Sequence, residues 1–90
     1  MAKEYWVKCD QIEPGMFPRE RSIYITQKNG QVNSGFIFER QVDEQNCLVK
    51  AYIVNENETD VLVENPSWSM FGPNRFWVCT SQIVEKEVPD

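Results

Sequence analysis

The chain holds few of the side chains that usually perform catalysis. It contains no histidine and three cysteines, Cys9, Cys47 and Cys79. A catalytic thiol needs a base or a positive environment that generates the thiolate, and histidine is the commonest base. The sequence also lacks a glycine-rich phosphate-binding loop. We therefore expect no catalytic residue, no cofactor and no enzymatic activity.

The cysteines do not follow a disulfide or zinc-binding pattern. Their number is odd, their spacings are long, and no C-x-x-C occurs. Cys9 alternates with Val7, and Cys47 alternates with Val49, as small core residues do. Cys79 shares its side of a strand with Trp77. We expect three free thiols in a reducing cytoplasm.

Carboxylates are concentrated in residues 56–64, which include Glu56, Glu58, Asp60 and Glu64. Calcium needs several oxygen ligands that converge on one point, and this segment lacks the glycine-bearing loop of an EF-hand. We interpret the segment as a solvated turn and a charged edge strand, and we expect no metal site.

The charge balance disfavours nucleic acid as the main partner. The chain has 9 basic and 14 acidic side chains and a net charge of −5. Binding to phosphates requires a basic surface, and the one basic concentration is Arg19, Arg21 and Lys28. Tyr24 adds a face on which a base could stack. These residues form the alternative hypothesis, a nucleic-acid-binding or ribosome-associated domain.

Aromatic side chains provide the leading hypothesis. Trp68 and Phe71 lie in a loop, residues 65–74, that is flanked by prolines. Such a loop either covers the end of the fold or presents a contact surface, and we expect one of the two rings to stay exposed. Trp77 and Tyr24 complete the predicted partner-binding set, because tryptophan and tyrosine combine a large contact area with a polar group.

Short strands must position these residues. Apolar residues alternate with a period of two, and no long segment has the helical period. We expect strands at residues 4–10, 22–28, 32–40, 47–54, 59–64 and 75–79. Asn29 and Gly30 predict a type I′ hairpin turn. Phe36, Phe38 and Phe76 are expected in the core, and the tail after residue 79 is expected to make one 3₁₀ turn and fray.

Five or six short antiparallel strands predict one all-β domain over residues 1–90. No apolar run is long enough to span a membrane, and no signal peptide is evident. The segment F-W-V-C-T-S-Q-I-V, residues 76–84, resembles the closing segment of SH3-like small barrels, in which an aromatic strand leads through a short 3₁₀ turn into the last strand. The loop G-M-F-P-R-E-R, residues 15–21, is similar to their long first loop.

The resemblance implies an SH3-like barrel of the uncharacterised bacterial type. It does not extend to the peptide-binding SH3 modules, because the start K-E-Y-W-V-K-C lacks their A-L-Y-D-Y motif. An OB-like barrel is the second choice, since the turns at 41–46 and 55–58 are too short for its helix. We expect a non-catalytic module that binds another protein in the cytoplasm.

Overall fold

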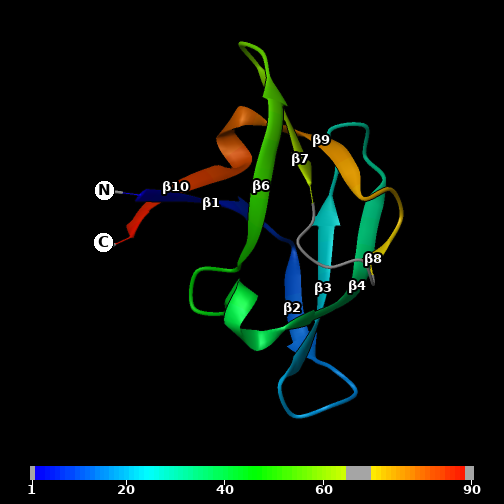
Figure 1. Cartoon of the computed structure of the whole chain (residues 1–90). Coiled ribbons are helices and arrows are strands. Elements are labelled where there is room, and N and C mark those ends of the chain that lie inside the picture. The colour runs from blue at the N-terminus through cyan, green and yellow to red at the C-terminus, as the bar shows by residue number, and fades with distance from the viewer. Residues whose placement is uncertain (1, 65–69, 89–90) are drawn as a thin grey trace.

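The computed structural model describes residues 2–64 and 70–88, and these residues form an all-β, antiparallel structure without an α-helix (Figure 1). The larger sheet has the strand order β10-β1-β6-β7-β9, and β5 also pairs with β6. The bounds are Ile83–Val88 for β10, Ala2–Lys8 for β1, Leu48–Glu56 for β6, Asp60–Glu64 for β7, Arg75–Cys79 for β9 and Val42–Asp43 for β5.

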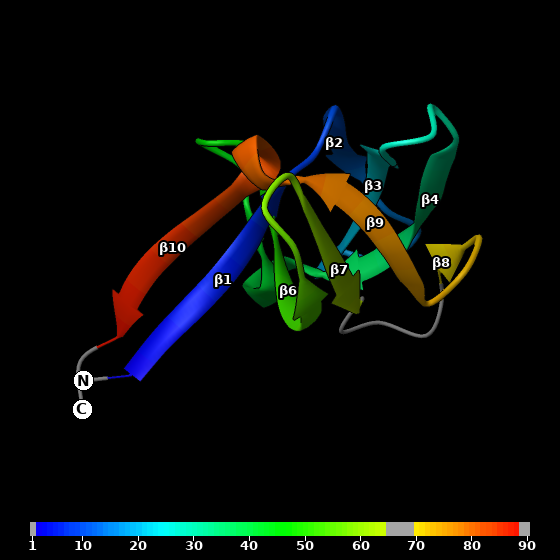
Figure 2. The same ribbon diagram turned by 90° about the horizontal axis from the view of Figure 1, so that it is seen from above.

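The smaller sheet is formed mainly by the chain between β1 and β6. Its strand order is β2-β3-β4-β8. The bounds are Gln11–Pro14 for β2, Glu20–Thr26 for β3, Val32–Phe38 for β4 and Met70–Phe71 for β8. Two 3₁₀ turns, Glu39–Gln41 (η1) and Thr80–Gln82 (η2), connect β4 to β5 and β9 to β10. In the view from above, the β1–β10 ribbon extends away from the smaller sheet (Figure 2).

One apolar core lies between the two sheets. It is built from alternate residues of six strands, as the period-two pattern requires. β1 and β6 contribute Val7 and Val49, β3 contributes Ile23 and Ile25, and β7 and β9 contribute Val63 and Val78, among others. The expected burial of Phe76 is confirmed.

Several expectations about the strands are wrong. The described residues form ten strands in two sheets, not five or six in one closed barrel. The tail does not fray after η2, because it pairs as β10 with β1 over six positions. Phe38 is 59% exposed, since the inner face of β4 carries Asn33, Gly35 and Ile37 instead.

The hairpin between β3 and β4 is present, but its turn differs from the prediction. A type I′ turn needs positive φ at both central residues, whereas Gly30 has φ +88° and Asn29 does not have a positive φ. The Gly30 N–H donates to the Gln27 carbonyl at 3.0 Å, and the Gln27 N–H donates to the Gln31 carbonyl at 2.8 Å. This is a three-residue loop in which Gly30 supplies the left-handed position that closes it.

Candidate functional site

A hollow of about 530 Å³ lies beside Trp77 on β9, and we call it the Trp77 hollow. The hairpin turn of the smaller sheet forms one side of it, and the β6–β7 turn and β9 form the rest. Its lining residues are Gln27, Lys28, Asn29, Asn57, Asp60, Arg75, Phe76 and Trp77. Phe76 and Val78 point into the core, so Trp77 between them points outward and is 38% exposed.

Charged side chains form the rim of the Trp77 hollow. The Lys28 ammonium forms an ion pair with Asp60, and the Lys28 N–H donates to the Trp77 carbonyl at 2.9 Å. The hairpin is thereby held against β9. Arg75 is more loosely held, because its Nε lies 3.6 Å from Glu64 Oε1 and its side chain is 58% exposed. A ligand in the hollow would therefore meet an indole ring and an accessible guanidinium group.

A buried amide pair supports the hairpin beneath the hollow. The Gln27 side-chain amide donates to Asn33 Oδ1, and Asn33 Nδ2 donates to the Pro73 carbonyl at 3.3 Å. Gly72 packs so closely here that a Cβ atom would lie 2.5 Å from Asn33 Oδ1. Because the two buried amide groups form a hydrogen bond with each other, their burial costs little free energy. The pair also fixes the position of the hairpin.

The predicted partner-binding residues are not assembled around Trp77. Trp68 lies outside the described residues. Phe71 is described in its backbone, which pairs with Ser34 in the smaller sheet. Tyr24 pairs with the same Ser34 from the other side and is half-buried, and it does not line the Trp77 hollow. Sequence reasoning found Trp77 but missed Lys28, Asp60 and Arg75 as its neighbours, since they come from three separate segments.

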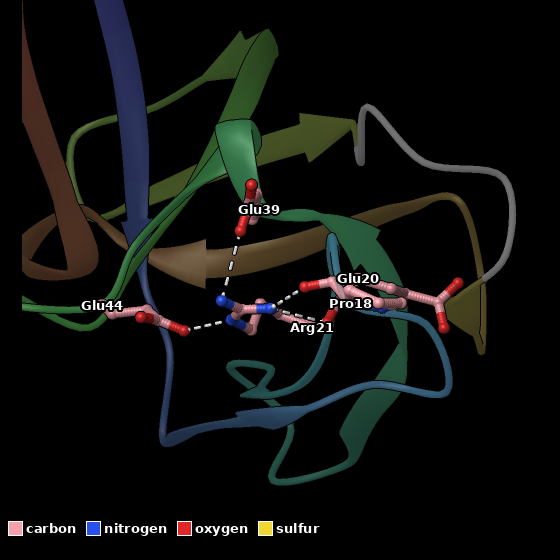
Figure 3. Close-up of polar contacts among 5 residues, drawn as sticks. All are labelled: Pro18, Glu20, Arg21, Glu39 and Glu44. Carbon is pink, nitrogen blue, oxygen red and sulfur yellow. Dashed lines mark hydrogen bonds and ion pairs between the residues drawn. The ribbon is translucent and has the colours of Figure 1, made fainter.

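The predicted basic group is also dispersed. Arg21 is held by four acceptors, as Figure 3 shows. It forms ion pairs with Glu39, at 3.2 Å, and with Glu44, and it donates to the carbonyls of Pro18 and Glu20. Its side chain is 21% exposed. Arg21 therefore joins the loop before β3 to η1 and to the turn after β5, and it has little capacity left for a phosphate.

Arg19 lies in a second, smaller hollow of about 240 Å³ with Phe38, Glu39 and Arg40. The guanidinium of Arg40 lies 5.3 Å from the centre of the Phe38 ring. Lys28 belongs to the Trp77 hollow instead. Glu39 both pairs with Arg21 and lines the hollow of Arg19, whereas Lys28 lies elsewhere, so the three predicted basic residues do not form one basic patch.

Cys9 and Cys47 are brought together, which the sequence analysis did not anticipate. Their Sγ atoms are 2.9 Å apart, and the Cys47 thiol also lies 3.2 Å from the Cys9 carbonyl, to which it donates. Burial, followed by the hydrogen bond to Cys47, raises the pKa of the Cys9 thiol far above its ordinary value. Cys79 is a half-buried thiol at the start of η2, where its N–H donates to Gln82 Oε1 at 3.0 Å.

The carboxylates serve local structure. Asp43 accepts hydrogen bonds from Asn46 and from the Lys86 ammonium, and these lower its pKa to about 2. Asn57 Oδ1 accepts from the backbone N–H groups of Thr59 and Asp60 and thereby shapes the turn before β7. Across residues 2–64 and 70–88, no group of three or more potential metal ligands is present. None of the helices in the same residues is long and apolar enough to cross a membrane.

No family model, curated protein or solved structure matches this chain.

Proposed function

We propose that this protein is a non-catalytic module that binds another protein through the Trp77 hollow. The observation that carries the proposal is the outward-facing indole of Trp77 on the wall of a hollow of about 530 Å³. Tryptophan in a concave site is typical of residues that dominate binding energy, because it removes a large area from water at a low entropic cost.

The chemistry of the rim indicates the kind of segment that would fit. An apolar or planar side chain can pack on the indole of Trp77, while a carboxylate next to it can reach Arg75. Arg75 is suited to this role because its contact with Glu64 is long and exposed, and such ion pairs contribute little. Lys28 is less available, since Asp60 already neutralises it. The expected partner segment therefore combines an apolar group with an acidic one.

Catalysis by the thiols is disfavoured by their surroundings. The chain has no histidine that could act as a base. The raised pKa of Cys9 keeps this thiol protonated at neutral pH, whereas a nucleophilic cysteine needs a lowered pKa. These observations support a binding function over an enzymatic one.

The binding proposal can be tested by site-specific photocrosslinking in the native lysate. A photoreactive phenylalanine analogue replaces Trp77 in one variant and Phe17 in a matched control. Phe17 is also aromatic and is 66% exposed, but it lies outside the Trp77 hollow. We expect one protein to crosslink from position 77 and not from position 17, and we expect an excess of unlabelled wild-type chain to suppress it. Equal crosslinking from the two positions would contradict the proposal.

We infer that the fold is an opened form of the SH3-like barrel. The segment 76–84 supports this inference, because β9 leads through η2, which contains Ser81, into β10. A second support is the segment of residues 15–21, which resembles the long first loop of such barrels and contains the loop between β2 and β3. An experimental structure in which β10 does not pair with β1 would overturn the inference.

A second candidate function is binding of single-stranded nucleic acid at the smaller hollow, of about 240 Å³, that contains Arg19 and Phe38. The observation that favours it is the exposed Phe38 ring, which shares this hollow with Arg19, Glu39 and Arg40, because an aromatic face beside cations is the usual platform for an unpaired base. Titration with single-stranded RNA at two salt concentrations tests it. Phosphate-driven binding must weaken steeply as salt increases, and it must be lost in the Arg19→Ala variant.

We further propose a reducing compartment, the cytoplasm, as the place where the chain works. The support is chemical: three cysteines without a framework pattern are present as thiols. Alkylation of thiols at the moment of cell lysis, followed by mass analysis, tests this. Recovery of a mostly cross-linked chain from unstressed cells would contradict it.

A further inference from the structure

Cys9 and Cys47 occupy matched positions at the end of one strand pair. β1 and β6 pair antiparallel up to Lys8 and Leu48, and the two cysteines stand one position further in the same register. The Cys9 N–H donates to the Cys47 carbonyl at 3.0 Å, which continues the ladder. Directly opposed residues of an antiparallel pair have Cα atoms about 4.5–5.5 Å apart, which is within the range that a disulfide requires.

The side chains have already approached each other. Their Sγ atoms are 2.9 Å apart, although the residues are 38 positions apart in the sequence. The backbone of Cys47 has φ +55°, the left-handed region that glycine and asparagine adopt readily and other residues rarely adopt. It is the single non-glycine residue with a positive φ in the part of the chain that the structure describes. Strain of this kind, held at a specific side chain, is a recognised mark of function.

The pair also has a special place in the topology. Cys9 follows β1, where the chain leaves the larger sheet, and Cys47 directly precedes β6, after β5 has already paired with β6 in that sheet. Between them lie β2, β3, β4, η1 and β5, which include most of the smaller sheet. A disulfide between Cys9 and Cys47 would close that whole segment into a ring.

We propose that Cys9 and Cys47 form a reversible disulfide by exchange with a small disulfide such as oxidised glutathione. The two ends of the segment between them are thus joined by a redox-sensitive cross-link. Nothing in the proposal depends on the Trp77 hollow. In a reducing compartment such a bridge would be transient and would respond to oxidation.

The exchange proceeds in two balanced steps. Cys47 reacts first: its thiol loses a proton, its sulfur attacks a sulfur of oxidised glutathione, the glutathione S–S bond breaks, and one glutathione leaves as a thiolate that takes up a proton. The Cys9 thiol, held next to Cys47, then gives up its proton as its sulfur attacks the Cys47 sulfur of the mixed disulfide, and the second glutathione is released and protonated. The two cysteines lose two protons and two electrons, and one oxidised glutathione becomes two reduced molecules.

The test uses the full chain with Cys79→Ser, which leaves two thiols. Serine retains a side-chain oxygen at the start of η2, so this variant preserves the turn. The protein is equilibrated with glutathione at increasing ratios of the oxidised to the reduced form, quenched with acid, alkylated and weighed. We expect a species that is lighter by two hydrogens and resists alkylation, with the peptides containing Cys9 and Cys47 joined in a peptide map.

The control is Cys47→Asn in the same background. Asparagine accepts the left-handed backbone, so this variant removes the thiol without adding strain. We expect it to form no species lighter by two hydrogens, and any glutathione that it takes up at Cys9 to remain as a mixed disulfide. The proposal is overturned if the two-thiol protein keeps both thiols at every ratio, or if it stops at the mixed disulfide as the control does.

A second measurement compares the melting temperatures of the oxidised and reduced two-thiol protein. Closing the segment between the cysteines restricts the unfolded chain, so we expect the oxidised form to melt at a higher temperature. An equal or lower melting temperature would mean that the bridge distorts the fold, and the proposed role as a built-in cross-link would be wrong.

Discussion

Two tryptophans lie on the outer face of the same sheet, and their surroundings are opposite. Val7 and Val78 point into the core, so Trp6 on β1 and Trp77 on β9 point away from it. Trp6 is nevertheless only 8% exposed, and the Lys86 ammonium lies 4.3 Å from the centre of its ring. Lys86 is in turn fixed by Asp43 at 2.7 Å. No comparable cover over Trp77 is present among the described residues.

The same contrast separates two arginines. Arg21 is surrounded by two carboxylates and two carbonyl groups, whereas Arg75 has one distant carboxylate, that of Glu64. Residue type alone would select all four side chains as candidate contacts. Their surroundings assign Trp6 and Arg21 to the fold and leave Trp77 and Arg75 available to a partner. The predictions below test this division.

The largest expected effect is at Trp6. Replacement by alanine removes a buried ring together with the surface on which Lys86 rests, and we expect a loss of about 3–5 kcal/mol in the free energy of unfolding. Chemical denaturation measures it. Trp6→Phe is the matched control and should lose less, since the Trp6 indole N–H is buried without a hydrogen-bond partner in the described part of the chain. A Trp6→Ala variant as stable as the wild type would show that the fold does not need Trp6 and would contradict the assigned contrast with Trp77.

The second largest loss in the free energy of unfolding is expected at Arg21. Arg21→Ala breaks hydrogen bonds to two carboxylates and two carbonyls, and bonds of this charged kind predict a loss of about 1–3 kcal/mol. Arg75→Ala is the control, and we expect it to stay within about 0.5 kcal/mol of the wild type, as exposed positions do. Urea denaturation of the two variants compares them directly. Equal losses would show that the two arginines do not differ as their contacts indicate.

The hairpin that borders the Trp77 hollow provides the next test. Gly30 has φ +88° and open space around the position of a Cβ atom, so any loss on substitution reports the backbone alone. We expect Gly30→Val to cost about 1–3 kcal/mol, because a β-branched residue is strained there. Gly30→Asn should be close to the wild type in thermal unfolding. If valine were tolerated as well as asparagine, the assigned turn would be wrong.

Acid should weaken the Trp6 side of the molecule through Asp43. The hydrogen bonds from Asn46 and Lys86 lower the pKa of Asp43 to about 2, below the ordinary value of 3.8. The stabilisation from this carboxylate is therefore present above about pH 3.8 and is lost as the pH falls towards 2. In a variant in which Trp6 is the single tryptophan, the fluorescence should report this loss of stabilisation as the pH falls. The same transition in an Asp43→Asn variant would argue against Asp43 as its origin.

The strands could be predicted from the sequence wherever local alternation determines them. β9 has the bounds that the alternation of Phe76 and Val78 predicts, and β7 differs by one residue. β10 was missed because its charged residues, Glu85 to Glu87, lack an apolar alternation, and its partner β1 lies at the other end of the chain. Phe38 was misplaced because the buried face of β4 contains Asn33, whose burial depends on a bond from Gln27.

The candidate site was predicted only in its central residue. The sequence shows that Trp77 alternates with Phe76 and Val78 and so predicts that it faces outward. Which residues surround Trp77 depends on how the hairpin folds against β9. The proximity of Cys9 and Cys47 was missed for a related reason. It depends on the register of β1 against β6, which is fixed by contacts between distant segments. Pairings of this kind have no local signal in a single sequence.

The central claim is that Trp77 is available to a partner because the fold does not need it. The direct measurement is the free energy of unfolding of Trp77→Ala, determined by chemical denaturation beside Trp6→Ala. The account predicts that Trp77→Ala stays within about 1 kcal/mol of the wild type, a difference of the size that strand preference alone produces. A loss as large as that of Trp6→Ala would contradict the account, because Trp77 would then be part of the structural core.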